Sequence, residues 1–264
     1  LPPQRIEQDV HALASFIARH SVTHTLCLPS LWDAVLEHVP AERLQALRTV
    51  IVAGEACSVR LVRRHYDVLP DASLWNEYGP TESTVWSTAT AIPRGFNGAR
   101  VPIGSPIAGT RVHVLERGGE PAPIGVPGEL WIGGEGLAAG YLNRPEESAL
   151  RFAPDPFSDE PGSRLYRTGD RARWREDGLL EFLGRVDQQV KVRGYRIEPG
   201  EIESVLRQHA GVRDSTVSVR AAPGHASQTV EVDSLVDVLS AMDPSEAERI
   251  LGVVERLTRP EDSP

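Results

Sequence analysis

The first ninety residues alternate between short apolar runs and amphipathic segments, and this alternation constrains the fold more than any other feature. Its spacing predicts a helix, strand, helix, strand, helix and strand in turn, over residues 4–20, 22–28, 31–38 (capped by Ser30), 48–53, 58–66 (capped by Ser58) and 74–76. Strands that alternate with helices predict an α/β layer with a mostly parallel sheet. In such sheets ligands bind at the carboxyl ends of the strands.

From about residue 92 the pattern changes to frequent Pro and Gly with short strands between them. Strands expected over 111–115, 128–132, 171–174 and 179–183 predict an antiparallel β unit, a distorted barrel. A helix over 199–208 and a strand over 215–219 indicate a small, truncated α+β subdomain. A loop or linker is expected over 221–229, and a helical tail after it, because Asp243 and Glu246 form a capping pattern. The expected boundaries are 1–186 for the large domain (α/β layer 1–91, β unit 92–186), 187–220 for the small subdomain and 221–264 for linker and tail.

Composition excludes several classes of function. The net charge of −9 and the pI of about 5.4 argue against a nucleic-acid partner. No apolar run has the length of a membrane span, so no membrane partner and a cytoplasmic location are expected. Cys27 and Cys57 lack metal-ligand spacing and are interpreted as reduced thiols. The chain does not start with Met, which suggests a piece of a longer protein, and its only lysine is Lys191.

An Asp177-Gly178 pair between two apolar runs is a strong hairpin signal. It predicts that Asp170 and Arg185 come from adjacent strands and lie close together. A carboxylate that follows Thr-Gly can accept hydrogen bonds from a diol, and a nearby guanidinium can bind a phosphate or carboxylate as a fork. The alternative interpretation is a surface hairpin with a salt bridge.

Four segments identify a resemblance. In chain order they are Asn-Glu-Tyr-Gly-Pro-Thr-Glu (76–82), Gly-Glu-Leu-Trp-Ile-Gly-Gly-Glu-Gly-Leu-Ala-Ala-Gly-Tyr-Leu (128–142), Tyr-Arg-Thr-Gly-Asp (166–170) and Gly-Arg-Val-Asp-Gln-Gln-Val-Lys-Val-Arg-Gly (184–194). Together they resemble motifs of the adenylation domains of nonribosomal peptide synthetases, over about residues 4–220. The resemblance implies a ligase that uses ATP, with Mg²⁺, to form an aminoacyl-adenylate, releasing pyrophosphate. The acyl group then passes to a phosphopantetheine thiol on a separate carrier domain, and carrier and condensation domains of the same synthetase are the expected partners.

The resemblance also assigns roles to individual residues. Its catalytic positions are Thr81, Glu82 and Lys191, with Glu82 as the Mg²⁺ ligand and Asp187 as the hinge between the two reaction steps. The implied nucleotide-binding residues are Gly54, Glu55, Ala56, Tyr78, Asp170, Phe182 and Arg185. The implied amino-acid pocket consists of Cys27, Ile51, Ala53, Glu77, Val85 and Trp86. Ordinary core packing is the alternative for the pocket residues, and Pro80 in a plain turn is the alternative for the Tyr78–Glu82 segment.

Other readings compete with this one. Gly134 to Ala139 fit a G-x-G-x-x-A dinucleotide pattern, but the Tyr-Leu-Asn-Arg-Pro that follows cannot form the long helix such a site requires. Ser234 is interpreted as a helix cap rather than a carrier serine. The family's phosphate loop would precede residue 1 and its catalytic lysine would follow residue 220. We therefore expect that this chain alone does not activate amino acids. The alternatives are a non-catalytic remnant that serves as a scaffold, or an acyl-CoA ligase of the same superfamily.

Overall fold

The computed structural model describes residues 6–187, 189–192, 195–197, 199–207, 217–221 and 228–231. These belong to two compact units, Leu1–Asp187 and Gln188–Pro264. The expected helical tail beyond Asp243 and the cap at Ser234 lie outside the described residues.

The first unit begins with a five-stranded sheet in the order β1-β2-β3-β4-β5. Its strands are β1 (His24–Cys27), β2 (Thr49–Ala53), β3 (Ser73–Tyr78), β4 (Thr88–Ile92) and β5 (Ser105–Pro106). The first three are parallel, as expected, whereas β4 and β5 add to the edge in antiparallel pairing. The sheet therefore extends beyond residue 91, where the α/β layer was expected to end.

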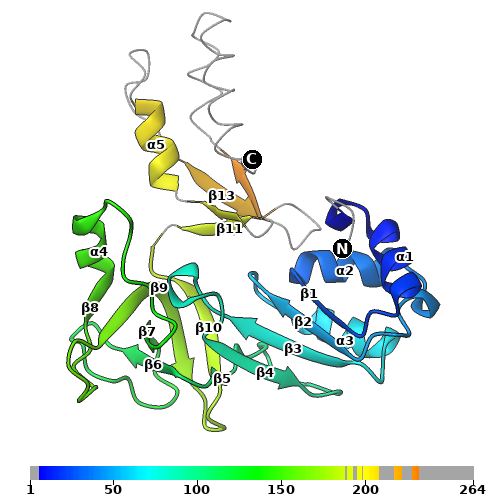
Figure 1. The fold of residues 1–264 in the computed structure, drawn as a ribbon, viewed down its shortest axis with the longest axis horizontal. Helices are drawn as coiled ribbons and strands as arrows, with labels where there is room; N and C mark the ends of the chain where they lie inside the picture. The colour runs from blue at the N-terminus through cyan, green and yellow to red at the C-terminus, as the bar shows by residue number, and fades with distance from the viewer. Residues whose placement is uncertain are drawn as a thin grey trace, which may run out of the picture. The chain divides into compact units, whose positions relative to one another are not determined.

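Helices α1 (Val10–His20), α2 (Pro29–His38) and α3 (Val59–Val68) pack with the sheet in one hydrophobic core (Figure 1). Short 3₁₀ turns, η1 (Ile6–Gln8) and η2 (Ala41–Arg43), accompany them. The Ser58 side chain accepts a hydrogen bond from the Leu61 amide at 3.1 Å, which confirms the expected cap of α3. Ser30 does not cap α2, because that helix begins at Pro29. Instead, the Ser30 amide donates to Glu55 Oε2 at 3.1 Å.

A buried histidine fixes α3 against α2 and the chain that follows. Trp32 Nε1 donates to His65 Nδ1 at 3.2 Å, so Nε2 carries the proton and donates to the Ala72 carbonyl at 2.9 Å. Both rings are almost fully buried. Burial lowers the pKa of His65, and the imidazole is neutral at pH 7.

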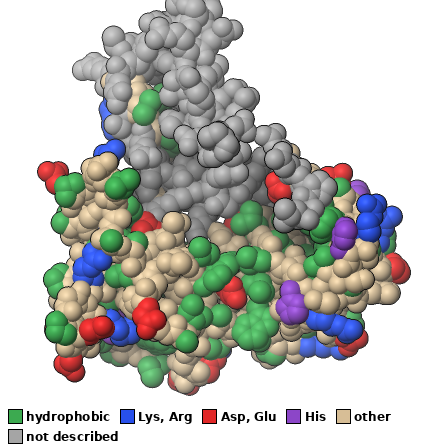
Figure 2. Space-filling model, in the orientation of Figure 1, with side chains coloured by type: hydrophobic (Ala, Val, Ile, Leu, Met, Phe, Trp, Pro, Cys, Tyr) green, Lys and Arg blue, Asp and Glu red, His purple; other side chains and the backbone are tan. Residues whose placement is uncertain are grey.

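The opposite face of the sheet carries apolar side chains that are partly exposed. Leu26, Ile51, Trp75 and Ala91 are register partners across four neighbouring strands. Leu26 is 52% exposed and Trp75 37%. Hydrophobic side chains are visible among charged ones on the described surface in Figure 2.

The second sheet of this unit has the antiparallel pairing expected of the β unit, and it curls like part of a barrel (Figure 1). Its strands run in the order β10-β9-β7-β6, with β8 on β9. Their bounds are β6 (Thr110–Leu115), β7 (Gly128–Gly134), β8 (Phe152–Pro154), β9 (Arg164–Trp174) and β10 (Leu180–Arg185). Helix α4 (Pro145–Arg151) precedes β8. Strand β9 starts earlier than expected and contains the whole Tyr166–Asp170 motif.

In the second unit, β11 (Val190–Val192) pairs with β12 (Tyr195–Ile197), a hairpin that was not expected. The expected helix follows as α5 (Pro199–Arg207). Strand β13 (Ser218–Ala221) pairs with β14 (Gln228–Glu231). Strand β14 falls within the segment expected to be linker and tail. Its β-branched Thr229 and Val230 favour a strand, and they pair with Arg220 and Val219 of β13.

Candidate active site

The β9–β10 hairpin places a buried acid opposite a basic residue. Asp170 and Arg185 are register partners, and a bulge between Phe182 and Gly184 precedes the pair. Arg185 Nη1 donates to Asp170 Oδ1 at 2.6 Å. The two side chains are 14% and 9% exposed, so this is a largely buried ion pair rather than the surface salt bridge of the alternative interpretation. The predicted proximity is confirmed.

The Thr-Gly-Asp sequence fixes the direction of the Asp170 carboxylate. Thr168 Oγ1 donates to the Leu130 carbonyl at 2.7 Å and accepts from the Asp170 amide at 2.9 Å. Gly169 has φ +73°, and a Cβ on it would lie 2.8 Å from Arg185 Nη2 and from an Asp187 oxygen. Only glycine fits both the left-handed backbone and this close approach.

Tyr78, at the end of β3, joins the two sheets at this point. Its hydroxyl donates to Asp170 Oδ2. Its ring centroid lies 6.3 Å from that of Phe182, at an interplanar angle of 34°. Burial, together with the negative charge of Asp170, raises the pKa of Tyr78 far above its usual range, so the phenol stays protonated. Four of the predicted nucleotide-binding residues therefore form one cluster: Tyr78, Asp170, Phe182 and Arg185.

The predicted hinge residue is attached to the same arginine. Arg185 binds Asp187 as a fork, from Nε at 2.6 Å and from Nη2 at 2.7 Å. Arg151 at the end of α4 lies 3.9 Å from the Asp187 carboxylate. Asp187 is the last residue of the first unit. Lys191 lies in β11 of the second unit, opposite Arg196, and its side chain is outside the described part of the structure.

Glu82 sits on a three-residue 3₁₀ turn, η3 (Thr81–Ser83), and is 6% exposed. The Tyr141 hydroxyl donates to Glu82 Oε1 at 2.6 Å. Thr81 precedes Glu82 on the exposed side of the turn. Across residues 6–187 and the short described pieces after them, no group of three or more His, Cys, Asp or Glu side chains could enclose a metal ion. A single buried carboxylate fits Mg²⁺ that takes its other ligands from phosphate and water, but not a metal held by protein alone.

The predicted pocket residues divide between two faces of the first sheet. Ala53 and Glu77 are register partners, and Ile51 lies two residues earlier on the same face. Burial raises the pKa of Glu77. Cys27 pairs in register with the buried Val52, on the face that the helices cover.

Val85 is part of a strained turn, and Trp86 follows it. Thr84 and Val85 have φ values of +57° and +72°, which are unfavourable for β-branched residues. Gly79 permits this turn, because a Cβ there would lie 2.1 Å from the Val85 carbonyl oxygen. Val85 is 50% exposed and Trp86 is half-buried. Strain of this kind, at the edge of a site, is typical of functional turns.

Gly54, Glu55 and Ala56 follow β2, whose neighbour β3 ends at Tyr78. Gly54 has φ +86°, as a sharp exit from the strand requires. The contact between Glu55 and the first turn of α2 gives this residue a structural role that the sequence did not indicate.

Burial raises the pKa of the Cys27 and Cys57 thiols to about 12, so neither is a nucleophile at pH 7.

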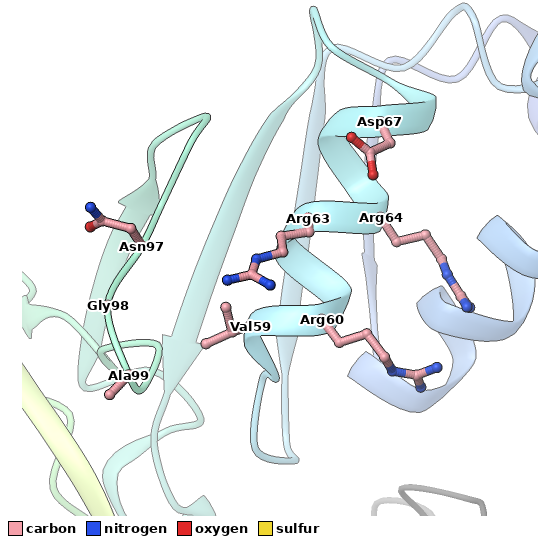
Figure 3. A pocket seen from close by; sticks show the side chains of 8 residues that line it. All are labelled: Val59, Arg60, Arg63, Arg64, Asp67, Asn97, Gly98 and Ala99. Carbon is pink, nitrogen blue, oxygen red and sulfur yellow. The ribbon is translucent and has the colours of Figure 1, made fainter.

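A separate surface pocket lies between α3 and the loop at 97–99 (Figure 3). It is lined by Val59, Arg60, Arg63, Arg64, Asp67, Asn97, Gly98 and Ala99. Figure 3 shows Arg63 directed toward the loop, whereas Arg60 and Arg64 extend to the other side of the helix. There they form ion pairs with Asp33, and Arg64 also with Glu37. The pocket contains none of the predicted site residues.

Three residues that contact predicted site residues were not predicted from the sequence: Thr168, Tyr141 and Arg151. Thr168 was visible within the Thr-Gly-Asp motif. Tyr141 is the penultimate residue of the motif at 128–142 but carries no local signal for its contact with Glu82, 59 residues earlier. Arg151 had no signal at all.

Comparison with known proteins decides the family. The AMP-binding enzyme family matches residues 1–142, more than half of the chain. The chain belongs to the AMP-binding enzyme family. Among curated proteins it is 46% identical over 211 residues to tyrocidine synthase 3 of Brevibacillus parabrevis, which covers 80% of this chain and 3% of that protein. It is 43% identical over 246 residues to a dimodular nonribosomal peptide synthase of Bacillus subtilis, covering 93% of this chain and 10% of that protein.

Solved structures agree with this assignment. An adenylation and carrier-domain protein, PA1221, matches with a TM-score of 0.77 and 33% identity, over 84% of this chain and 38% of that one. A Vibrio cholerae adenylation domain in complex with glycyl-adenosine-5'-phosphate matches with a TM-score of 0.74 and 28% identity, over 88% and 44%. This member of the AMP-binding family thus corresponds to part of an adenylation domain and spans less than half the length of these relatives. Among the described residues of this family member, no helix is long and apolar enough to cross a membrane.

Proposed function

We propose that this chain is part of an amino-acid-activating ligase of nonribosomal peptide synthesis. In this reaction the amino-acid carboxylate attacks the α-phosphate of ATP, giving an aminoacyl-adenylate and pyrophosphate. The acyl group then moves to a phosphopantetheine thiol on a carrier domain. The observation that carries the proposal is the Tyr78–Asp170–Arg185 cluster, in which the Tyr78 hydroxyl and Arg185 Nη1 both donate to the buried Asp170 carboxylate.

Each member of the cluster suits one part of the nucleotide. The Asp170 carboxylate is the proposed acceptor for the two ribose hydroxyls, since each carboxylate oxygen can accept more than one hydrogen bond. The Tyr78 ring supplies a stacking face for adenine, with Phe182 packed nearby. Arg185 holds the acid in place and adds positive charge close to the nucleotide.

Glu82 is the proposed ligand of Mg²⁺, which neutralises charge on the phosphates when bound. Thr81, exposed beside it, is the proposed donor of a hydrogen bond to a phosphate oxygen. Gly54, Glu55 and Ala56 line the adenine, while Ile51, Ala53, Glu77, Val85 and Trp86, with Cys27 at the end of β1, shape the amino-acid pocket. Lys191 serves the transfer step, and the unit that contains it turns about Asp187.

The proposed partners are the carrier and condensation domains of the same synthetase, in the cytoplasm, where both thiols stay reduced. Support for the carrier comes from solved relatives that combine adenylation and carrier domains. The test is ATP–pyrophosphate exchange by the full-length protein with each of the twenty amino acids. Exchange that depends on one amino acid is expected. Exchange that depends on a fatty or aryl acid instead would support an acyl-CoA ligase.

A further inference from the structure

The segment Gly134–Tyr141 begins with the dinucleotide pattern of Gly134–Ala139, which the fold does not use, and the segment packs tightly against the Glu82 turn. The Ala138 amide donates to the Glu82 carbonyl at 2.8 Å. Thr84 Oγ1 donates to the Gly136 carbonyl at 2.6 Å. The side-chain contact between Tyr141 and Glu82 completes three connections between one loop and one short turn.

The glycines of this segment are what allow the close approach. A Cβ on Gly136 would lie 3.0 Å from the Ser83 carbonyl oxygen, and one on Gly134 would lie 2.1 Å from the Gly109 carbonyl oxygen. Gly134 also has φ +120°, which side-chain-bearing residues rarely adopt. The pattern thus serves packing of backbone on backbone rather than a phosphate.

The loop itself is held from its other side. Arg164 donates to the Ala139 carbonyl at 2.8 Å and to the Ala138 carbonyl at 3.1 Å. Its guanidinium lies 5.5 Å from the centre of the Phe152 ring. The Tyr141 amide donates to Ser148 Oγ at 2.8 Å, which ties the end of the loop to α4. These contacts therefore hold the backbone that carries Tyr141, and its hydroxyl, in one position.

A three-residue turn followed by two residues at positive φ cannot by itself hold a carboxylate in one direction. We propose that Gly134–Tyr141 is a positioning loop for the Glu82 carboxylate, and that Tyr141 is its positioning residue. The Tyr141 hydroxyl donates a hydrogen bond to Oε1 of Glu82, and this bond orients the Glu82 carboxylate toward a magnesium–phosphate ligand. The inference rests on the proposed role of Glu82, and Tyr141 itself touches neither metal nor nucleotide.

The test measures binding in the full-length protein by calorimetry, using ATP over a magnesium series and AMP without magnesium. Tyr141→Phe removes one oxygen atom and keeps the ring. Loss of an outer partner of a metal ligand typically reduces metal affinity by about tenfold or more. We expect the magnesium concentration that half-saturates ATP binding to rise by about that factor, with AMP affinity unchanged. Tyr66→Phe is the matched control, because its hydroxyl bonds to the Ile92 carbonyl in the core of the first sheet.

Three results would overturn the inference. The first is an unchanged magnesium requirement in Tyr141→Phe while Glu82→Gln raises it, which would leave the role of Glu82 intact. The second is equal weakening of ATP and AMP binding, or the same magnesium shift in Tyr66→Phe, because either would indicate general loosening. The third is an unchanged requirement in Glu82→Gln, which removes the proposed function of Glu82 and the positioning role with it.

Discussion

Asp170→Asn separates the nucleotide-binding role of the β9–β10 hairpin from its structural role. The substitution preserves the shape of the side chain but removes its charge. A hydrogen bond to a charged group contributes about 1.5–3 kcal/mol, so nucleotide affinity should fall roughly ten- to hundredfold. The broken pair with Arg185 should also lower the free energy of unfolding, by less than the ~3–5 kcal/mol typical of a fully buried pair, because Arg185 keeps its fork to Asp187.

The same hairpin offers a matched control. Glu181 is 5% exposed and accepts from Arg173 Nε at 2.6 Å, so it forms a second ion pair between the same two strands, although the Arg173 side chain is 41% exposed. Glu181→Gln should lower stability by less than Asp170→Asn does, because Arg173 is more exposed than Arg185, and it should leave nucleotide affinity unchanged. The measurements are ATP and AMP titration by calorimetry and denaturant unfolding of the complete adenylation domain. Equal loss of affinity in both variants, or wild-type affinity in Asp170→Asn, would refute the reasoning.

Three further predictions follow from other parts of the molecule. Burial lowers the pKa of His65, so the unfolded chain binds a proton at this group before the folded protein does as pH falls below about 6.5. His65 should therefore lower the free energy of unfolding by up to about 1.4 kcal/mol for each pH unit below that value. In His65→Gln, unfolding curves measured at several pH values should show a weaker dependence of the free energy of unfolding on pH. Asp187→Pro should reduce thioester formation far more than pyrophosphate exchange, and equal loss of both would exclude a hinge role. Residues 1–264 alone should show no pyrophosphate exchange with any amino acid, since their only lysine belongs to the transfer-step motif. Robust exchange would contradict this, because another residue of the chain would then have to supply the catalytic group.

The sequence by itself determined the local structure and the family. The spacing of hydrophobic residues predicted α1, α3 and the parallel strands. A helix repeats every 3.6 residues and a strand every two, and the order of apolar and polar side chains shows these periods directly. The Asp177-Gly178 turn was enough to predict that Asp170 and Arg185 would be strand neighbours. The start of α2 was misjudged, because the group that binds the first-turn amide of Ser30 belongs to Glu55, 25 residues later.

Tertiary structure decided what local pattern cannot encode, namely contacts between segments far apart in the chain. The bond from Tyr78 to Asp170 spans 92 residues, and that from Tyr141 to Glu82 spans 59. No periodicity or spacing rule reports such pairs, because each depends on how the two sheets of the first unit meet. The sequence therefore identified the chemical groups of the site, whereas tertiary packing determined which of these groups contact one another.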